Sequence, residues 1–140
     1  MIKKTIKFTD YNGVEREEDF YFNLSKAELA EMQLSTTGGL EQMIQEIIQT
    51  KDIPKIMELF KKMIKASYGK KSPDGRRFMK SQEILDDFMQ TEAYSNLFME
   101  LSTNDEVAAE FVKGIIPDDL RKEYEASLAK NPDLKMLANK

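Results

Sequence analysis

The residues best suited to bind another molecule are basic side chains gathered between positions 70 and 80. A Ser72-Pro73-Asp74-Gly75 segment lies among them, and its residue types are typical of a tight turn. The sequence therefore predicts that residues 69–80 form a loop. The candidate partner-binding residues on it are Lys70, Lys71, Arg76, Arg77, Phe78 and Lys80.

Three interpretations fit this basic loop. Cations beside aromatic rings can bind nucleic acid, cations can dock on an acidic protein, and a charged loop can simply be solvated. Residues 61–80 carry eight basic and one acidic side chain, a net charge of +7, whereas the whole chain has a net charge of −4. A protein with net negative charge binds nucleic acid poorly, so we expect no nucleic-acid partner. Docking on an acidic protein and a merely solvated loop both stay open.

The chain lacks the residue types that most enzymes use for catalysis. There is no cysteine and no histidine, which excludes Cys–His and Ser–His–Asp nucleophiles and zinc sites built on thiolate or imidazole. The adjacent acids Asp86-Asp87 and Asp118-Asp119 would point about 100° apart on a helix, which makes a shared ligand unfavourable. The glycines after Thr37 lack the spacing of a phosphate-binding loop. We therefore expect no enzyme, no cofactor and no metal site.

The composition indicates one folded domain. The chain has 140 residues, of which 41% are hydrophobic and 33% charged, and a chain of this length can bury a core without disulfides. No apolar run approaches the roughly 20 residues that span a bilayer, and no apolar segment typical of a signal peptide follows the N-terminus. We expect a cytoplasmic location and no membrane partner.

Two runs of alternating apolar and polar residues predict a β-hairpin over about residues 2–22. A two-residue turn at Asn12-Gly13 would put the apolar residues of the two strands on opposite faces. A three-residue loop with Gly13 in the left-handed conformation shifts the register by one and pairs Phe8 with Arg16. We favour this bulged loop because it places both apolar rows on one face. The other face would carry Glu15, Glu17, Asp19 and Tyr21.

Helical periodicity dominates the rest of the chain and predicts about five to six short helices. One of them covers about residues 40–49, and Pro117 ends the last. The expected N-terminal caps are Ser25, Asp52, Ser81, Thr91 and a capping box over 103–106. The predicted fold is mainly α, with a domain over 1–117 made of the hairpin (1–24) and a helical bundle (25–117). Residues 118–140 are expected to form a weakly helical or flexible, frayed tail.

Several segments carry a distinctive combination of residues. They are TDYNGV at 9–14, DFYFNL at 19–24, KAEL at 26–29, TEAYS at 91–95 and GIIP at 114–117. The most specific is Tyr-Gly-x-x-Ser-x-Asp-Gly-x-x-Phe at 68–78. Together, over about residues 1–120, they resemble the tail assembly chaperones of long-tailed bacteriophages (siphoviruses) of Gram-positive hosts.

The resemblance implies a protein that binds the tape measure protein in the host cell cytoplasm, keeps it soluble and helps recruit major tail tube protein subunits. It also implies that the protein is absent from the mature virion and that a longer form arises by ribosomal frameshifting. Self-association is a further expectation. Nine methionines supply flexible apolar side chains that suit either an adaptable binding surface or an irregular core. The alternative is a structural tail or head–tail component that stays in the virion.

Overall fold

The computed structural model describes residues 1–35, 46 and 52–117 of the chain. The predictions for 40–49, apart from the helical residue 46, and for 118–140 lie outside the described residues. The elements are β1 (Ile2–Thr9), β2 (Glu15–Phe22), α1 (Lys26–Ser35), α3 (Ile53–Ser67), β3 (Tyr68–Lys71), β4 (Phe78–Met79), α4 (Gln82–Met89), α5 (Glu92–Thr103) and α6 (Asp105–Ile115). The prediction of an N-terminal antiparallel hairpin followed by helices is confirmed.

The register of the first hairpin is the one that the bulged loop predicts. Phe8 pairs with Arg16, and the pairing continues without a slip to Ile2 and Phe22. Gly13 has a φ of +79°, and the Asp10 amide donates to the carbonyl of Val14 across the turn. The positive φ explains why glycine occupies this position, since a side chain there would clash with the backbone. The apolar rows of both strands consequently face the core.

The prediction of a tight turn at Ser72–Gly75 is confirmed by a hydrogen bond from the Gly75 amide to the Ser72 carbonyl, but the prediction that all of residues 69–80 form a loop is wrong. After α3 the chain continues as β3, where Gly69 and Tyr68 pair with Tyr21 and Phe22 of β2. β4 then returns beside β3, and the sheet has four strands in the order β1-β2-β3-β4. The two strands are so short that their sequences show no alternation of apolar and polar residues, which is the pattern that predicts strands.

Side-chain caps fix where most described helices begin. The amide of Ser25 donates to Glu28 at 2.9 Å while the Glu28 amide donates to Ser25 Oγ at 3.1 Å, which confirms the predicted capping box. Asp52, Ser81 and Thr91 likewise accept from the first turns of α3, α4 and α5. Each cap satisfies a backbone N–H that has no partner within the helix.

The cap of α6 corrects the predicted capping box at 103–106. Thr103 still belongs to α5, and its hydroxyl donates to the carbonyl of Met99. The cap is Asn104, whose Oδ1 accepts from the amides of Glu106 and Val107 at 3.1 and 3.2 Å. Asparagine is as good a cap as threonine, so α5 can run one residue further before α6 begins.

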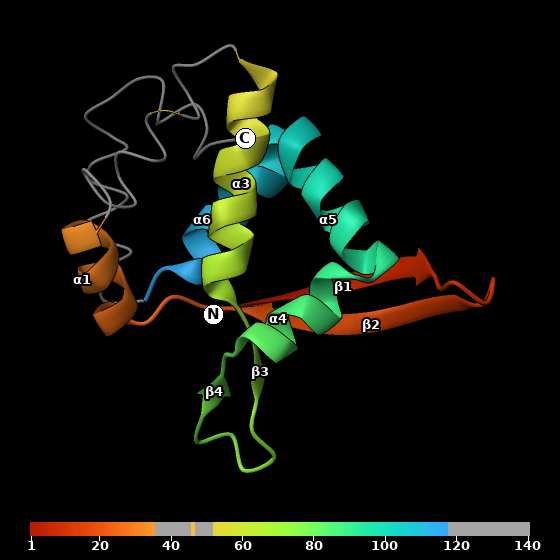
Figure 1. Cartoon of the computed structure of the whole chain (residues 1–140), viewed down its shortest axis with the longest axis horizontal. Helices are drawn as coiled ribbons and strands as arrows, with labels where there is room; N and C mark the ends of the chain where they lie inside the picture. Colours follow the sequence, from red (N-terminus) through yellow and green to blue (C-terminus); the bar gives the residue numbers. More distant parts are fainter. Residues whose placement is uncertain (36–45, 47–51, 118–140) are drawn as a thin grey trace.

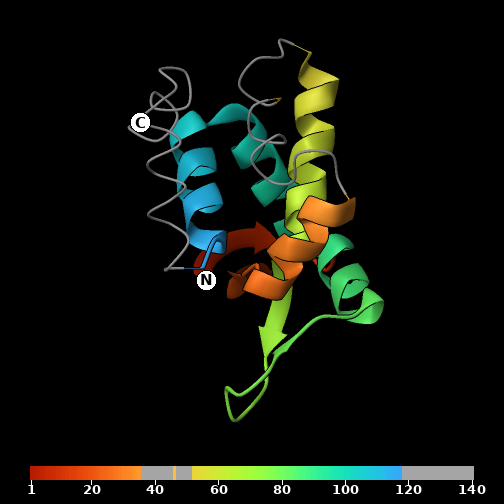
Figure 2. The same ribbon diagram turned by 90° about the vertical axis from the view of Figure 1, so that its left-hand side faces the viewer.

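One hydrophobic core joins the sheet to the helices. Figure 1 shows α3, α5 and α6 on one side of the β1–β2 hairpin, and Figure 2 shows the β3–β4 hairpin extending the opposite way. Phe22 lies at the centre with no exposed surface, and its ring centroid is 5.2 to 5.9 Å from those of Phe111, Tyr68 and Phe88. The core thus holds two hairpins in place, and both project beyond it.

Candidate functional site

The turn of the β3–β4 hairpin is built by hydrogen bonds around Ser72 and Asp74. Ser72 Oγ donates to Asp74 Oδ1 at 2.6 Å, and the amide of Arg76 donates to the same oxygen. The Arg77 amide donates back to Ser72 Oγ at 3.0 Å. The bond from Ser72, followed by the one from the Arg76 amide, lowers the pKa of Asp74. The turn is therefore a defined structure that holds the basic side chains outward.

Four of the predicted site residues lie exposed on this hairpin, and we call Lys70, Lys71, Arg76 and Arg77 the basic tip. Lys70 Nζ is 3.9 Å from Asp87, and the guanidinium of Arg76 is 3.8 Å from Asp74. Lys71 Nζ lies 4.3 Å from the centre of the Tyr21 ring. These are exposed contacts of modest strength, so the cations can exchange them for contacts with a partner. A role of the basic tip in partner binding stays a prediction.

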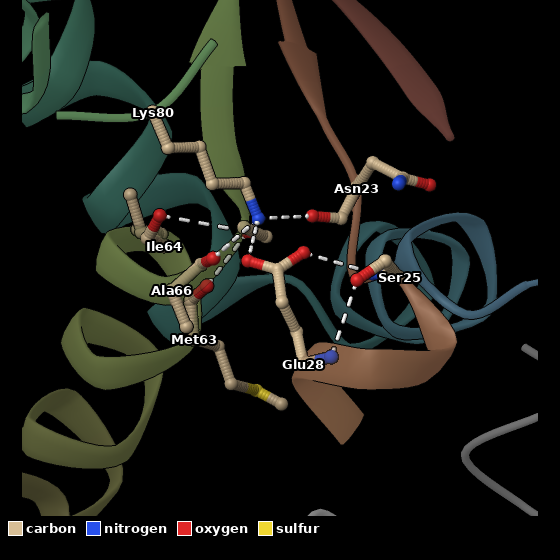
Figure 3. A network of polar contacts seen from close by, with 8 residues as sticks. Asn23, Ser25, Glu28, Met63, Ile64, Ala66 and Lys80 are labelled. Carbon is tan, nitrogen blue, oxygen red and sulfur yellow. Dashed lines mark hydrogen bonds and ion pairs between the residues drawn. The ribbon is translucent and has the colours of Figure 1, made fainter. Parts of the chain in front are cut away.

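Lys80 lies at the base of the hairpin instead, where it joins three parts of the chain (Figure 3). Its Nζ donates to Glu28 Oε2 at 2.6 Å, to the carbonyl of Asn23 at 2.7 Å and to that of Ala66 at 2.8 Å. Burial raises the pKa of Glu28, but the bonds from Lys80 and Ser25 outweigh burial and the pKa is lowered. Lys80 is thus bound to α1, to the end of α3 and to the segment after β2.

Phe78 also lies at the base, where its ring covers Gly69. A Cβ added at Gly69 would come within 2.7 Å of the Phe78 ring and 2.8 Å of the Met79 carbonyl oxygen. The carbonyl belongs to the strand ladder and cannot move without disturbing it. The close approach of β4 to β3 therefore requires glycine at position 69.

Replacing Gly69 by alanine is expected to lower the free energy of unfolding by about 1–3 kcal/mol, because the added methyl overpacks the hairpin. Urea denaturation of the full chain would measure this loss. The matched control is Lys70→Ala, which removes an exposed neighbour and should change stability by less than about 0.5 kcal/mol. Equal stability of the two variants would show that β4 does not press on Gly69.

The second charged surface is the solvent face of β2. Glu15, Glu17 and Asp19 are all exposed there, and we call these three residues the acidic edge. Glu17 lies 3.6 Å from Lys7, and Asp19 accepts a bond from the Thr5 hydroxyl at 2.6 Å. The alternation of the sequence predicted this face, but its position beside an open part of the sheet depends on β3, which the sequence did not reveal.

A charged cleft of about 740 Å³ lies between the tip of the first hairpin and the start of α5. Its lining includes Lys7, Asp10, Arg16 and Glu92. The Glu92 side chain accepts a hydrogen bond from the Tyr11 hydroxyl, and this bond raises the pKa of Tyr11. A lining of this kind suits water and ions better than the apolar side chains of a protein partner.

Other kinds of site do not appear in the part of the chain that the structure describes. Over these residues no group of three His, Cys, Asp or Glu side chains is placed to hold a metal ion. Within the same residues, no helix has the length and apolarity needed to cross a membrane.

Comparison with known proteins identifies the family. No curated protein and no solved structure matches the chain. The family model described as phage tail assembly chaperone matches residues 1–140, which is the whole chain. This full-length match agrees with the family that the segments between positions 9 and 117 resemble. The chain belongs to the phage tail assembly chaperone family.

Proposed function

We propose that this protein binds the tape measure protein of a siphovirus of a Gram-positive host and keeps it soluble until tail tube subunits assemble around it. Family membership over all 140 residues carries the proposal. The protein would act in the host cytoplasm, without catalysis or a cofactor, and would leave before the virion is complete. The absence of histidine and cysteine from the sequence supports a binding role over a catalytic one.

The two charged hairpins support reversible binding. Exposed ion pairs contribute only about 0.2–1 kcal/mol each, so a client held partly through them can be released when tube subunits compete. The basic tip and the acidic edge carry opposite charge and project from different strands. A long client with mixed charge could therefore contact both surfaces.

Co-expression with the tape measure protein of the same genome tests the proposal. The expected result is that most of the tape measure protein moves from the pellet to the soluble fraction when this chain is present. An equally insoluble tape measure protein with and without the chain would contradict the proposal. Mass spectrometry of purified virions tests the alternative, because abundant peptides from this chain would favour a structural component of the particle.

Replacing the four cations of the basic tip by alanine is expected to weaken client binding about tenfold or more at low salt, since four exposed contacts sum to about 1–3 kcal/mol. The difference should shrink at high salt, because mobile ions screen exposed charges. Affinity measured by biolayer interferometry at two salt concentrations would show both effects.

The matched control changes four exposed lysines elsewhere to alanine, namely Lys3, Lys61, Lys62 and Lys65. It removes the same charge from the chain but leaves the basic tip intact. If the control loses as much affinity as the basic-tip variant, net charge and not this surface governs binding.

A further inference from the structure

The outer edge of β2 is only partly covered by β3. β2 pairs with β1 along its full length, from Glu15 to Phe22. Its pairing with β3 is limited to Tyr21 and Phe22. Among the described residues, the edge of β2 opposite β1 therefore has no strand paired with it from Glu15 to Phe20. An uncovered strand edge offers a row of backbone donors and acceptors to another strand.

The backbone N–H and C=O groups of the acidic edge point away from β1, toward the uncovered side of β2. In an antiparallel pair, successive residues direct their N–H and C=O groups alternately toward and away from the neighbouring strand. The carbonyl of Val14 accepts from the amide of Asp10, directly after β1, whereas the amide of Asn23 donates to the carbonyl of Ser67 on the opposite side. The backbone N–H and C=O groups of the even-numbered residues of β2 thus face β1. The N–H and C=O groups of Glu15, Glu17 and Asp19 face the open side.

The space beside this edge is open where the sheet divides. A cleft of about 380 Å³ lies between β2, the departing β3 and the end of α4, and its lining includes Glu18, Asp19, Phe20, Lys70 and Asp87. It extends from the paired residues Tyr21 and Gly69 along β2 to Glu18. A strand lying along the acidic edge would end in this cleft without displacing β3.

The negative charges of the acidic edge determine which kind of strand can pair with it. A second copy that paired its own β2 here in the antiparallel direction would set acidic side chains against acidic side chains, which is destabilising. A strand with lysine or arginine at every second residue would instead place a cation opposite each acid. β1 already provides one example on the other side, where Lys7 lies opposite Glu17 at 3.6 Å.

We propose that the acidic edge of β2 binds an extended segment of a partner protein that carries lysine or arginine at alternate positions, and that this segment adds as an antiparallel strand. Backbone hydrogen bonds to Glu15, Glu17 and Asp19 supply affinity, and ion pairs on the solvent face supply selectivity. As the assignment of a client-binding surface, this inference rests on the proposed function.

The test uses a synthetic peptide, acetyl-Thr-Lys-Val-Lys-Val-Lys-Thr-amide, and the full chain. Hydrogen exchange should slow at the amides of Glu15, Glu17 and Asp19 when the peptide is bound, because these N–H groups gain acceptors. Methylating two lysine amide nitrogens of the peptide should weaken binding by about tenfold or more, since those N–H groups face the edge. Methylating the two valine amide nitrogens, which face away, should change affinity by less than about threefold.

Protein variants test the charge requirement. Glu15→Gln, Glu17→Gln and Asp19→Asn together should weaken peptide binding by about tenfold or more. The matched control, Glu58→Gln with Glu83→Gln and Glu110→Gln, removes the same charge from exposed helix positions and should bind as the wild type does. Circular dichroism would establish that both variants remain folded.

Three results would overturn the inference: no binding of the unmodified peptide, equal effects of the two methylation patterns, or equal effects of the two triple variants. None of these depends on a tail protein. If the peptide binds as expected but the tape measure protein stays insoluble on co-expression, the proposed function fails and the edge assignment stands. If the tape measure protein is kept soluble but the peptide does not bind, the edge assignment alone fails.

Discussion

Replacing Phe22 by alanine is expected to lower the free energy of unfolding by about 3–5 kcal/mol, the range for removing a fully buried aromatic ring. Phe22 has no exposed surface and contacts the rings of Tyr68, Phe88 and Phe111. These partners come from β3, α4 and α6, so one cavity would loosen three packing contacts at once. Because a folded domain is stable by only about 5–15 kcal/mol, the variant should unfold at markedly lower temperature and urea concentration.

The matched control for this prediction is Tyr11→Ala in the same hairpin. Tyr11 is 76% exposed, so its loss should change stability by less than about 0.5 kcal/mol. Chemical denaturation followed by circular dichroism would compare the two variants. A Phe22→Ala protein as stable as the Tyr11→Ala protein would mean that Phe22 is not central to the core.

Replacing Lys80 by methionine is expected to lower the free energy of unfolding by about 2–3 kcal/mol, because it leaves a partly buried carboxylate and two carbonyls without their shared donor. The partners that would lose the bond are Glu28, Asn23 and Ala66. Changing Glu28 to glutamine as well removes the unpaired charge, so the double variant should recover part of the loss. A single variant as stable as the wild type would contradict the proposed structural role of Lys80.

The ion pair between Lys80 and Glu28 predicts that stability depends on pH. Burial raises the pKa of Glu28, but bonds from Lys80 and Ser25 outweigh it and set the folded-state pKa below the ordinary value of 4.5. The stabilisation from Glu28 is therefore complete above pH 4.5 and is lost as pH falls through the lowered pKa. The stability difference between wild type and Lys80→Met should narrow on going from about pH 6 to about pH 3. A stability difference that stays constant across this pH range would show that the ionisation of Glu28 does not contribute to the effect of Lys80.

The first hairpin could be predicted in detail because two local constraints agree. The alternation of apolar residues requires one face for both strands, and Gly13 permits the bulged turn that produces this register. Capping at Ser25, Asp52, Ser81 and Thr91 is local in the same way. Each depends on a side chain and an amide three residues apart, which a sequence displays directly.

The second hairpin and the role of Lys80 could not be predicted because they depend on contacts between distant residues. Tyr68 and Gly69 form a strand since Phe22 and Tyr21 lie beside them, more than forty positions earlier in the chain. Lys80 reads as one more cation of a basic run, yet its partner Glu28 is 52 residues away. The sequence shows the positive charge of residues 70–80, but it does not show which of these cations point into solvent.

The most direct measurement of the proposed function follows the client on and off the protein. The tagged chain would be purified from cells that also make the tape measure protein, before and after tail tube subunits are added. The proposal predicts that the tape measure protein co-purifies at first, and that added tube subunits assemble on it and release the tagged chain. Absence of the tape measure protein from the first purification, or retention of the tagged chain in the assembled tubes, would contradict the proposal.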